Sequence, residues 1–242
     1  RGWHPLQIEV SVFVNDALRR SAAHVFIDQI DGGELADDDA HHLLKVLRIR
    51  ENDVISVSDG RGLWATATLG KGGEVSLLEA PQFVQAKAHR LGVAFVPVKG
   101  ERPEMVVQKL TEIGIDDVYP LAPSAHSVVK WDGDRADKHH ARLVKVAREA
   151  AMQSRRVWLP IVHPVVSLAE LCATEQVACA EPGGDVLDAS HRLIAVGPEG
   201  GFSREELGNA TATVSLGESI LRAETAAIVA GALMINLRGG GR

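Results

Sequence analysis

Two segments near the C-terminus combine residue types that could bind a ligand and act on it. The first is Gly197-Pro198-Glu199-Gly200-Gly201, which follows an apolar stretch typical of a buried strand, residues 193–196. Glycines after a parallel strand let the backbone approach a ligand closely and adopt positive φ. Pro198 stiffens the loop, whose amides and carbonyls could then bind a planar base. A tight turn without a ligand is the alternative, since the loop matches neither the dinucleotide nor the nucleoside triphosphate fingerprint.

The second segment, residues 216–226, again joins a predicted strand to a predicted helix. Leu216-Gly217 ends the strand, and Ile220-Leu221-Arg222-Ala223-Glu224-Thr225 leads into the helix. The dipole at a helix N-terminus stabilises a glutamate, whereas an arginine there needs an anionic partner, for which an RNA phosphate is suitable. In the alternative interpretation, Glu224 only stabilises the helix and pairs with Arg222.

A domain of alternating strands and helices must position these segments. Residues 91–242 are typical of an α/β domain with a mainly parallel sheet. Its strands are expected at residues 91–98, 118–121, 177–180, 193–196 and 213–216. Its helices are expected between Pro103 and Gly114, over residues 135–154, after the capping boxes Ser167-x-x-Glu170 and Ser203-x-x-Glu206, and over residues 221–237. On the long helix, Leu143, Ala147, Ala150 and Ala151 share one side.

Residues 10–80 predict a separate, small β-rich module, most simply a barrel. Its strands are expected at residues 10–14, 24–28, 53–58, 63–69 and 74–79. One helix interrupts them, beginning near Asp37 or Asp38 and turning Leu43, Leu44 and Leu47 inward. Residues 81–90 are expected to link the two domains.

The composition of the chain does not identify a class of function, but the charges are unevenly distributed along the sequence. The formal net charge is -6, which argues against simple nucleic-acid binding, yet residues 130–156 hold eight basic and four acidic residues. That excess of four positive charges fits a phosphate backbone, and it equally fits a solvated helix face. No apolar run approaches the roughly 18 to 20 residues that cross a bilayer, and the start of the chain has no apolar signal-peptide core. We therefore expect a cytoplasmic protein with reduced thiols at Cys172 and Cys179, and no metal site.

Taken together, the motifs resemble the RsmE family of the SPOUT class. The glycine loop, Leu216-Gly217 and residues 220–226 match its C-terminal signature. HLLKVLR (residues 42–48) with END (51–53) is similar to its PUA-like RNA-binding module, and KGER (99–102) with QKLTEIG (108–114) to its central motif. EAAMQSRR (149–156) with Pro160 is similar to the end of its long helix. The extreme N-terminus departs from the family, because no arginine stands just before the first expected strand and residues 1–9 fit no family pattern.

The resemblance implies a methyltransferase that uses S-adenosylmethionine, held in a trefoil knot, to modify N3 of a uridine in small-subunit ribosomal RNA. Because N3 of uridine is protonated at neutral pH, a base or a cation that favours the uridinate is required. Arg222 and Glu224 are the catalytic candidates. The expected cofactor-binding residues are Gly197, Pro198, Glu199, Gly200, Gly201, Leu216, Gly217, Ile220, Leu221 and Arg222. The expected RNA contacts are His42, Arg48, Lys99, Arg102, Lys109, Arg155 and Arg156, each of which could instead be an ordinary surface charge.

The resemblance also implies a homodimer that acts on ribosomal RNA, either naked or within a small-subunit particle. Small residues of the last helix, which include Ala223, Ala226, Ala227, Ala230, Gly231 and Ala232, would allow two chains to approach closely, although some of this surface must pack on the helix's own sheet. Such a dimer could bring basic residues of one chain near the cofactor of the other. Two alternatives remain: a SPOUT enzyme acting on a ribose 2′-hydroxyl or a transfer-RNA base, and a non-catalytic RNA-binding assembly factor.

Overall fold

The computed structural model describes residues 16–30, 35–50, 53–70, 73–100, 102–131 and 133–239, and divides the chain into two compact units. Unit 1 covers Arg1–Gln85 and unit 2 covers Ala86–Arg242. The division falls within residues 81–90, where the sequence predicts a linker. The first part of that stretch is not a linker, however, because Gln82–Phe83 form strand β5, which pairs with β3 of unit 1.

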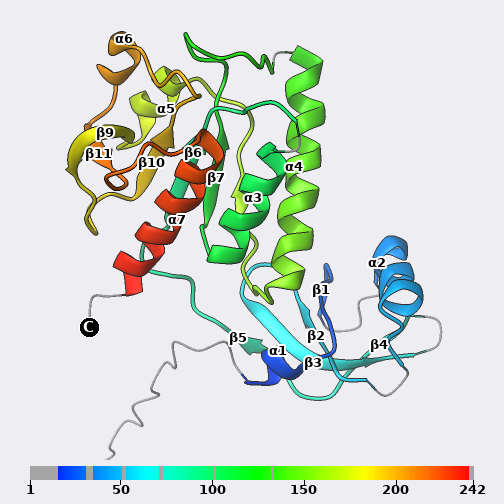
Figure 1. Ribbon diagram of the computed structural model, residues 1–242. Coiled ribbons are helices and arrows are strands. Elements are labelled where there is room, and N and C mark those ends of the chain that lie inside the picture. The colour runs from blue at the N-terminus through cyan, green and yellow to red at the C-terminus, as the bar shows by residue number, and fades with distance from the viewer. Residues whose placement is uncertain are drawn as a thin grey trace, which may run out of the picture. The chain divides into compact units, whose positions relative to one another are not determined.

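Unit 1 is built on one sheet in which β1-β2-β3-β4 are neighbours and β5 also pairs with β3 (Figure 1). Its strands are β1 (His24–Phe26), β2 (Ile55–Ser58), β3 (Leu63–Leu69), β4 (Val75–Leu77) and β5. Its helices are α1 (Asp16–Arg20) and α2 (Asp37–His41), and a π-helical turn, His42–Val46, continues α2. The predicted strands at 24–28, 53–58, 63–69 and 74–79 are confirmed. The one expected at 10–14 lies outside the described residues, and closure into a barrel stays a prediction.

The predicted inward face of the first helix is right at Leu43 and wrong at Leu47. Leu43 is buried, whereas the side chain of Leu47 is 48% exposed. In a regular α-helix these residues, four apart, would share a face. Here the helix widens into the π-helical turn and ends at Val46, and Arg48 adopts a positive φ of 54°. Leu47 is thereby turned toward solvent.

Unit 2 is a parallel sheet in the order β11-β9-β10-β6-β7-β8, with helices on both faces. The strands are β6 (Gly92–Phe95), β7 (Asp117–Pro120), β8 (Ile161–Val162), β9 (Ala178–Val186), β10 (Leu193–Val196) and β11 (Ala212–Ser215). The helices are α3 (Arg102–Ile113), α4 (Gly133–Gln153), α5 (Leu168–Thr174), α6 (Arg204–Leu207) and α7 (Ala223–Gly239). The α/β class and the parallel sheet are confirmed; the trefoil knot stays a prediction.

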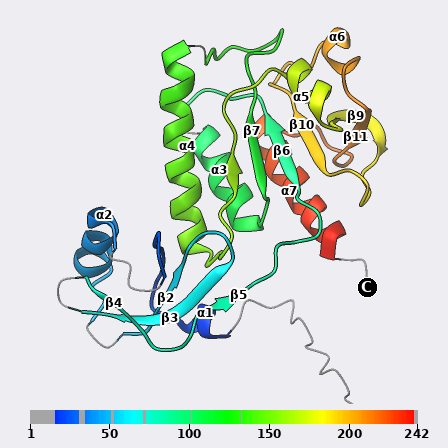
Figure 2. The ribbon, with the colours of Figure 1, turned by 180° about the vertical axis from the view of Figure 1, so that it is seen from behind.

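Two apolar cores, one on each face of the sheet, hold unit 2 together. Alternate residues of the central strands, such as Val93 and Ala94 of β6, enter opposite cores because successive side chains of a strand point to opposite faces. The first core packs the sheet against α3, α4 and α7, and the second packs it against α5 and α6. Figures 1 and 2 show this layering from its two sides. The carboxyl ends of the strands are thus left at one edge, where loops can form a site.

Several local predictions for unit 2 are also confirmed. The buried residues of α4 are Leu143, Ala147, Ala150 and Ala151. Ser167 and Ser203 both form complete capping boxes with the glutamate three positions later. Among the described helices, none is both long and apolar enough to cross a membrane.

Candidate functional site

A cavity of about 300 Å³ lies at the carboxyl ends of β10 and β11. Three segments line it: the middle of β9, the glycine loop after β10, and the stretch from the end of β11 into α7. The lining residues are Ala180, Glu181, Pro182, Val196, Gly197, Pro198, Glu199, Gly200, Gly201, Ser215, Leu216, Gly217, Ser219, Ile220, Leu221, Ala223 and Ala226. Of the residues expected to bind a cofactor, all except Arg222 therefore surround one cavity.

The glycine loop is a tight turn and also a wall of this cavity. The amide of Gly201 donates to the carbonyl of Pro198 at 2.8 Å, and Gly201 has a φ of 70°, a conformation that favours glycine. A side chain at Gly197 would meet the amide nitrogen of Phe202 at 3.1 Å. Phe202 is itself buried in the second core, so the loop is anchored at its far end. The loop is hence both a tight turn and a candidate ligand-binding loop, because the turn presents its backbone to the cavity.

The third wall of the cavity, formed by β9, is not predicted by the sequence analysis. Thr213 of β11 pairs with Cys179, but the next residue, Val214, pairs with Asp185, so residues 180–184 bulge out of the sheet. A side chain at Gly184 would meet the backbone nitrogen of Val214 at 2.7 Å, which requires a glycine there. The signal was present, because Pro182-Gly183-Gly184 begins two residues after the end of the predicted strand 177–180.

Glu224, at the start of α7, pairs with Arg102 and not with Arg222. The guanidinium Nη1 of Arg102, at the start of α3, lies 3.5 Å from Glu224 Oε1 and 3.9 Å from Glu199 Oε1. Glu224 is 8% exposed, and among the described residues its Oε2 has no hydrogen-bond partner. Arg102 thus joins the glycine loop to the helix that follows the cavity.

Arg222 lies between two cavity-lining residues, Leu221 and Ala223, and its side chain is exposed. Its carbonyl accepts the first backbone bond of α7, from the amide of Ala226 at 2.8 Å. Within the part of the chain that the structure describes, its guanidinium forms no ion pair. This exposed cation, next in sequence to two lining residues, is consequently available to an incoming anion.

Comparison with known proteins identifies the family. A family model described as an RNA methyltransferase domain matches residues 85–235, and a second, an RNA methyltransferase PUA domain, matches residues 35–77. A ribosomal RNA small subunit methyltransferase E of Mycobacterium tuberculosis is 33% identical over 215 residues, covering 80% of this chain and 82% of that protein. The protein of the same name from Bacillus subtilis is 30% identical over 230 residues, covering 84% and 90%.

The chain belongs to the RsmE family of ribosomal RNA methyltransferases. A solved member from Neisseria gonorrhoeae, bound to S-adenosylmethionine, has a TM-score of 0.76 and 26% identity, and the match covers 89% of this chain and 97% of that one. A Legionella pneumophila methyltransferase, also solved with that cofactor, has a TM-score of 0.78 and 25% identity, with the same coverage. The family is S-adenosylmethionine-dependent.

The cavity fits the cofactor of the RsmE family. Its volume lies at the lower end of the range for small-molecule sites, which combine an apolar lining with a few polar groups. Val196, Leu216, Leu221 and Ala226 supply apolar surface, while the loop amides and the carboxylates of Glu181 and Glu199 supply the polar groups. Carboxylates beside such a cavity suit a ligand that carries positive charge and hydroxyl groups.

The expected RNA contacts of this RsmE member lie in different places. Lys99 and Arg102 follow the carboxyl end of β6, at the edge of the sheet that holds the cavity. Lys109 is on α3 and pairs with Glu112 at 2.8 Å. Arg48 is exposed in unit 1, and the side chain of His42 lies outside the described residues.

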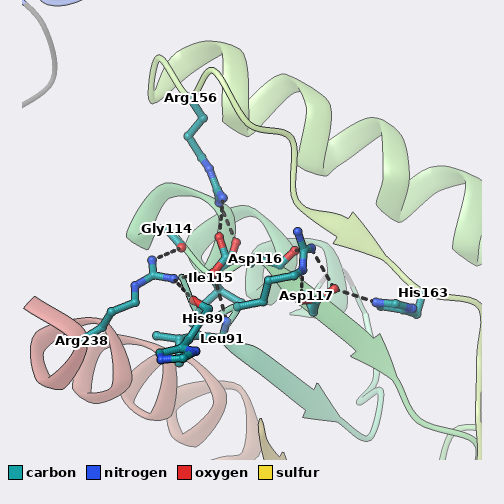
Figure 3. Close-up of polar contacts among 10 residues, drawn as sticks. His89, Leu91, Gly114, Ile115, Asp116, Asp117, Arg156, His163 and Arg238 are labelled. Atoms are coloured by element: carbon teal, nitrogen blue, oxygen red, sulfur yellow. Dashed lines mark hydrogen bonds and ion pairs between the residues drawn. The ribbon is translucent and has the colours of Figure 1, made fainter. Parts of the chain in front are cut away.

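Arg156, an expected RNA contact, is engaged within its own chain, and its contact with RNA stays a prediction. Its guanidinium donates to the carbonyls of Thr111 at 3.0 Å and Ile115 at 2.7 Å, and it pairs with Asp116 at 3.5 Å. Figure 3 shows Arg156 and Arg238 reaching Asp116 from two sides. Burial lowers the pKa of Arg156 to about 10, and Asp116 opposes that shift, so the group stays charged at neutral pH.

This polar cluster lies at the amino end of β7, the edge opposite the cavity, because Asp116 immediately precedes β7. Arg155, next to Arg156, has a φ of 56°, and burial lowers its pKa. The arginine pair therefore belongs to the far edge of the sheet within one chain. In the sequence, these two residues are indistinguishable from a phosphate-binding pair.

Proposed function

We propose that this protein transfers a methyl group from S-adenosylmethionine to N3 of a uridine in small-subunit ribosomal RNA. The observation that carries the proposal is the cavity at the ends of β10 and β11, whose lining includes every residue of the glycine loop. Family membership supports the cofactor and the class of substrate. The RsmE relatives in Mycobacterium tuberculosis and Bacillus subtilis are named for the small-subunit RNA on which they act.

The bound cofactor would supply a methyl group on a sulfonium, a leaving group that needs no further activation. The protein must then present N3 in line with that methyl group and stabilise N3 without its proton. A new N–C bond forms as the C–S bond breaks, and the N3 proton passes to solvent or to a base. We assign the stabilisation of the resulting negative charge to Arg222, since its exposed guanidinium follows the cavity-lining Leu221.

Glu224 is better suited to positioning than to proton transfer. It is buried, it is absent from the cavity lining, and its carboxylate lies 3.5 Å from Arg102. We infer that Glu224 fixes Arg102, which in turn approaches Glu199 of the glycine loop. Two helix N-termini and the loop are thereby held together around the site.

Methylation of defined RNA tests this proposal. Purified protein, labelled S-adenosylmethionine and either naked small-subunit RNA or small-subunit particles should give 3-methyluridine, mapped by mass spectrometry of nuclease fragments. Methyl groups on a ribose would support a different SPOUT target. Cofactor binding without any methyl transfer to either RNA would support the assembly-factor alternative.

We also infer that the active form is a homodimer. A groove of about 600 Å³ adjoins the cofactor cavity and is lined by the β9 bulge, by residues after β11 and by Leu233, Asn236 and Leu237 of α7. Two of its lining residues are highly exposed, Val186 at 85% and Ile220 at 89%. Apolar surface of this kind is typical of a contact between chains. The similarity to SPOUT enzymes, which pair through the knotted domain, favours a second copy as the occupant.

A further inference from the structure

The loop between β7 and α4 carries a histidine that contacts the outer side of the glycine loop. His126 is exposed and does not line the cavity. Its Nδ1 lies 3.1 Å from the carbonyl oxygen of Gly201. Because a carbonyl can only accept a hydrogen bond, Nδ1 must carry the proton, which fixes the tautomer of the neutral ring.

His126 also packs against Gly200. A side chain at Gly200 would meet the Cβ of His126 at 2.8 Å, so the glycine is required by this contact. The sequence interpretation was that glycine leaves space for the ligand. The structure gives Gly200 a second reason, since the face away from the cavity is covered by the β7–α4 loop.

A second contact, next to that of His126, holds the β7–α4 loop in place. The amide of Ala125 donates to Glu206 Oε1 at 3.1 Å, and the amide of Ser203 donates to Glu206 Oε2 at 2.7 Å. Burial tends to raise the pKa of Glu206, but the hydrogen bonds from Ser203 and Ala125, with the nearby His126, lower it overall. One carboxylate thus caps α6 and holds the β7–α4 loop against the end of the glycine loop.

We propose that His126 is a positioning residue for the cofactor: its Nδ1–H holds the Gly201 carbonyl, and so the glycine loop, in the conformation that lines the cavity. The proposal rests on the proposed use of S-adenosylmethionine. It assigns part of the cofactor affinity to a side chain that the cofactor does not touch. The hydrogen bond from Gly201 to Pro198 closes the turn of the glycine loop, and the hydrogen bond from His126 attaches that loop to the β7–α4 loop.

Three substitutions separate the hydrogen bond from the packing. His126→Ala removes both, His126→Phe keeps the bulk beside Gly200 without a donor, and His126→Asn offers an amide donor at the position of Nδ1. Val128→Ala is the matched control, since Val128 lies in the same loop and is 68% exposed. Calorimetry with S-adenosylmethionine gives Kd, and steady-state methylation gives KM and kcat.

We expect Kd and KM for S-adenosylmethionine to rise about 3- to 10-fold in the Ala and Phe variants, as for loss of one hydrogen bond. The Asn variant and the control should stay near wild type, with kcat at saturating cofactor unchanged throughout. Wild-type affinity in both His126→Ala and His126→Phe would overturn the proposal, as would an Asn variant as weak as Ala. If the wild-type protein itself does not bind the cofactor, the proposed function fails instead.

The tautomer gives an independent check. Long-range ¹H–¹⁵N spectra of histidine-labelled protein should show a protonated Nδ1 at His126, both in the free protein and with cofactor. A neutral ring protonated only at Nε2 would contradict the hydrogen bond to Gly201.

Discussion

Arg222 and Glu224 stand two positions apart, yet their surroundings give them different chemistry. Glu224 is buried and already engaged with Arg102, so any change in its charge would disturb α3 and α7 together. Arg222 is exposed next to cavity-lining residues, and its guanidinium can pair with an anionic group of an incoming substrate. A group that stabilises charge only in the transition state changes kcat more than cofactor affinity.

Arg222→Ala is therefore expected to lower kcat about 100-fold, the usual effect of removing one donor to a developing anion. Cofactor affinity should change little, because the cavity is lined by the neighbours of Arg222 and not by Arg222 itself. Raising the pH should recover part of the loss, since N3 then loses its proton more easily. Methylation rates and calorimetry on the same preparations measure both effects.

Arg222→Lys and Thr225→Ala are the controls for that experiment. Lysine keeps the positive charge and should retain part of the activity, and Thr225 is exposed in the first turn of α7. An Arg222→Ala enzyme with wild-type kcat would show that another group stabilises the uridinate.

At the scale of elements, Asp116 joins three parts of unit 2. Its carboxylate accepts from Arg156, which follows α4, and from Arg238 at the end of α7, and it also accepts from the amide of Leu91 at 3.0 Å before β6 (Figure 3). Arg238 further donates to the carbonyl of Gly114 at 3.1 Å. The last helix, which begins at the cavity, is thus fastened at its other end by one carboxylate.

Asp116→Asn should lower the free energy of unfolding by roughly 2–3 kcal/mol, because two largely buried arginines lose their shared anion. Glu112→Gln, which breaks the more exposed pair with Lys109, should cost less than about 0.5 kcal/mol. Urea denaturation of both variants provides the comparison. Equal losses would mean that the Asp116 cluster contributes no more than a surface pair.

The elements that could be predicted from the sequence are those that depend on interactions between residues close together in the chain. Capping boxes and the apolar side of α4 depend on residues three or four apart, and both were predicted. The β9 bulge depends on the close approach of Gly184 to β11, a partner far along the chain. The same holds for the site: the glycine loop was found from its own residues, but the pairing of Arg102 with Glu224 required the fold.

The small residues of α7 illustrate the same limit. The sequence predicts that they are divided between a seam with a second chain and the helix's own sheet, and a side chain at Gly231 would meet Leu110 of α3 at 2.7 Å. Ala227 and Ala230 are fully buried in the first core of their own chain. Small residues indicate close approach, and the sequence does not say to which surface.

At the scale of the whole molecule, each unit has its own core, and both cores of unit 2 consist of residues within 86–242. A fragment of residues 86–242 should bind S-adenosylmethionine with the affinity of the full chain. It should methylate RNA at least about tenfold more slowly, because RNA positioning is lost with unit 1. Calorimetry and methylation assays test the two halves of this prediction.

The salt dependence of RNA binding is the control for that fragment. The affinity of the full chain for RNA should fall steeply with salt, and the fragment should show a shallower slope because fewer phosphates are contacted. Full RNA activity in the fragment would show that unit 1 has another role.

The oligomeric state gives the last prediction, and the structure changes how it must be tested. Ala230 is 0% exposed within one chain, so a charge there would unfold the protein whether or not it dimerises. Val186 is a better position, because it is exposed in the single chain and lines the groove beside the cofactor cavity. A glutamate at Val186 leaves the monomer intact and places a carboxylate in the proposed interface, where burial without a partner is costly.

Sedimentation equilibrium of the wild type should give about twice the chain mass of 25.9 kDa. Val186→Glu should shift the mass toward one chain and lower methylation with it, whereas Val128→Glu, on an exposed loop outside the groove, should change neither. Mass and methylation must be measured together, because disruption of a dimer that is not needed for catalysis would lower the mass without lowering the activity. A wild-type protein that is monomeric and fully active would refute both the interface and any sharing of the site between chains.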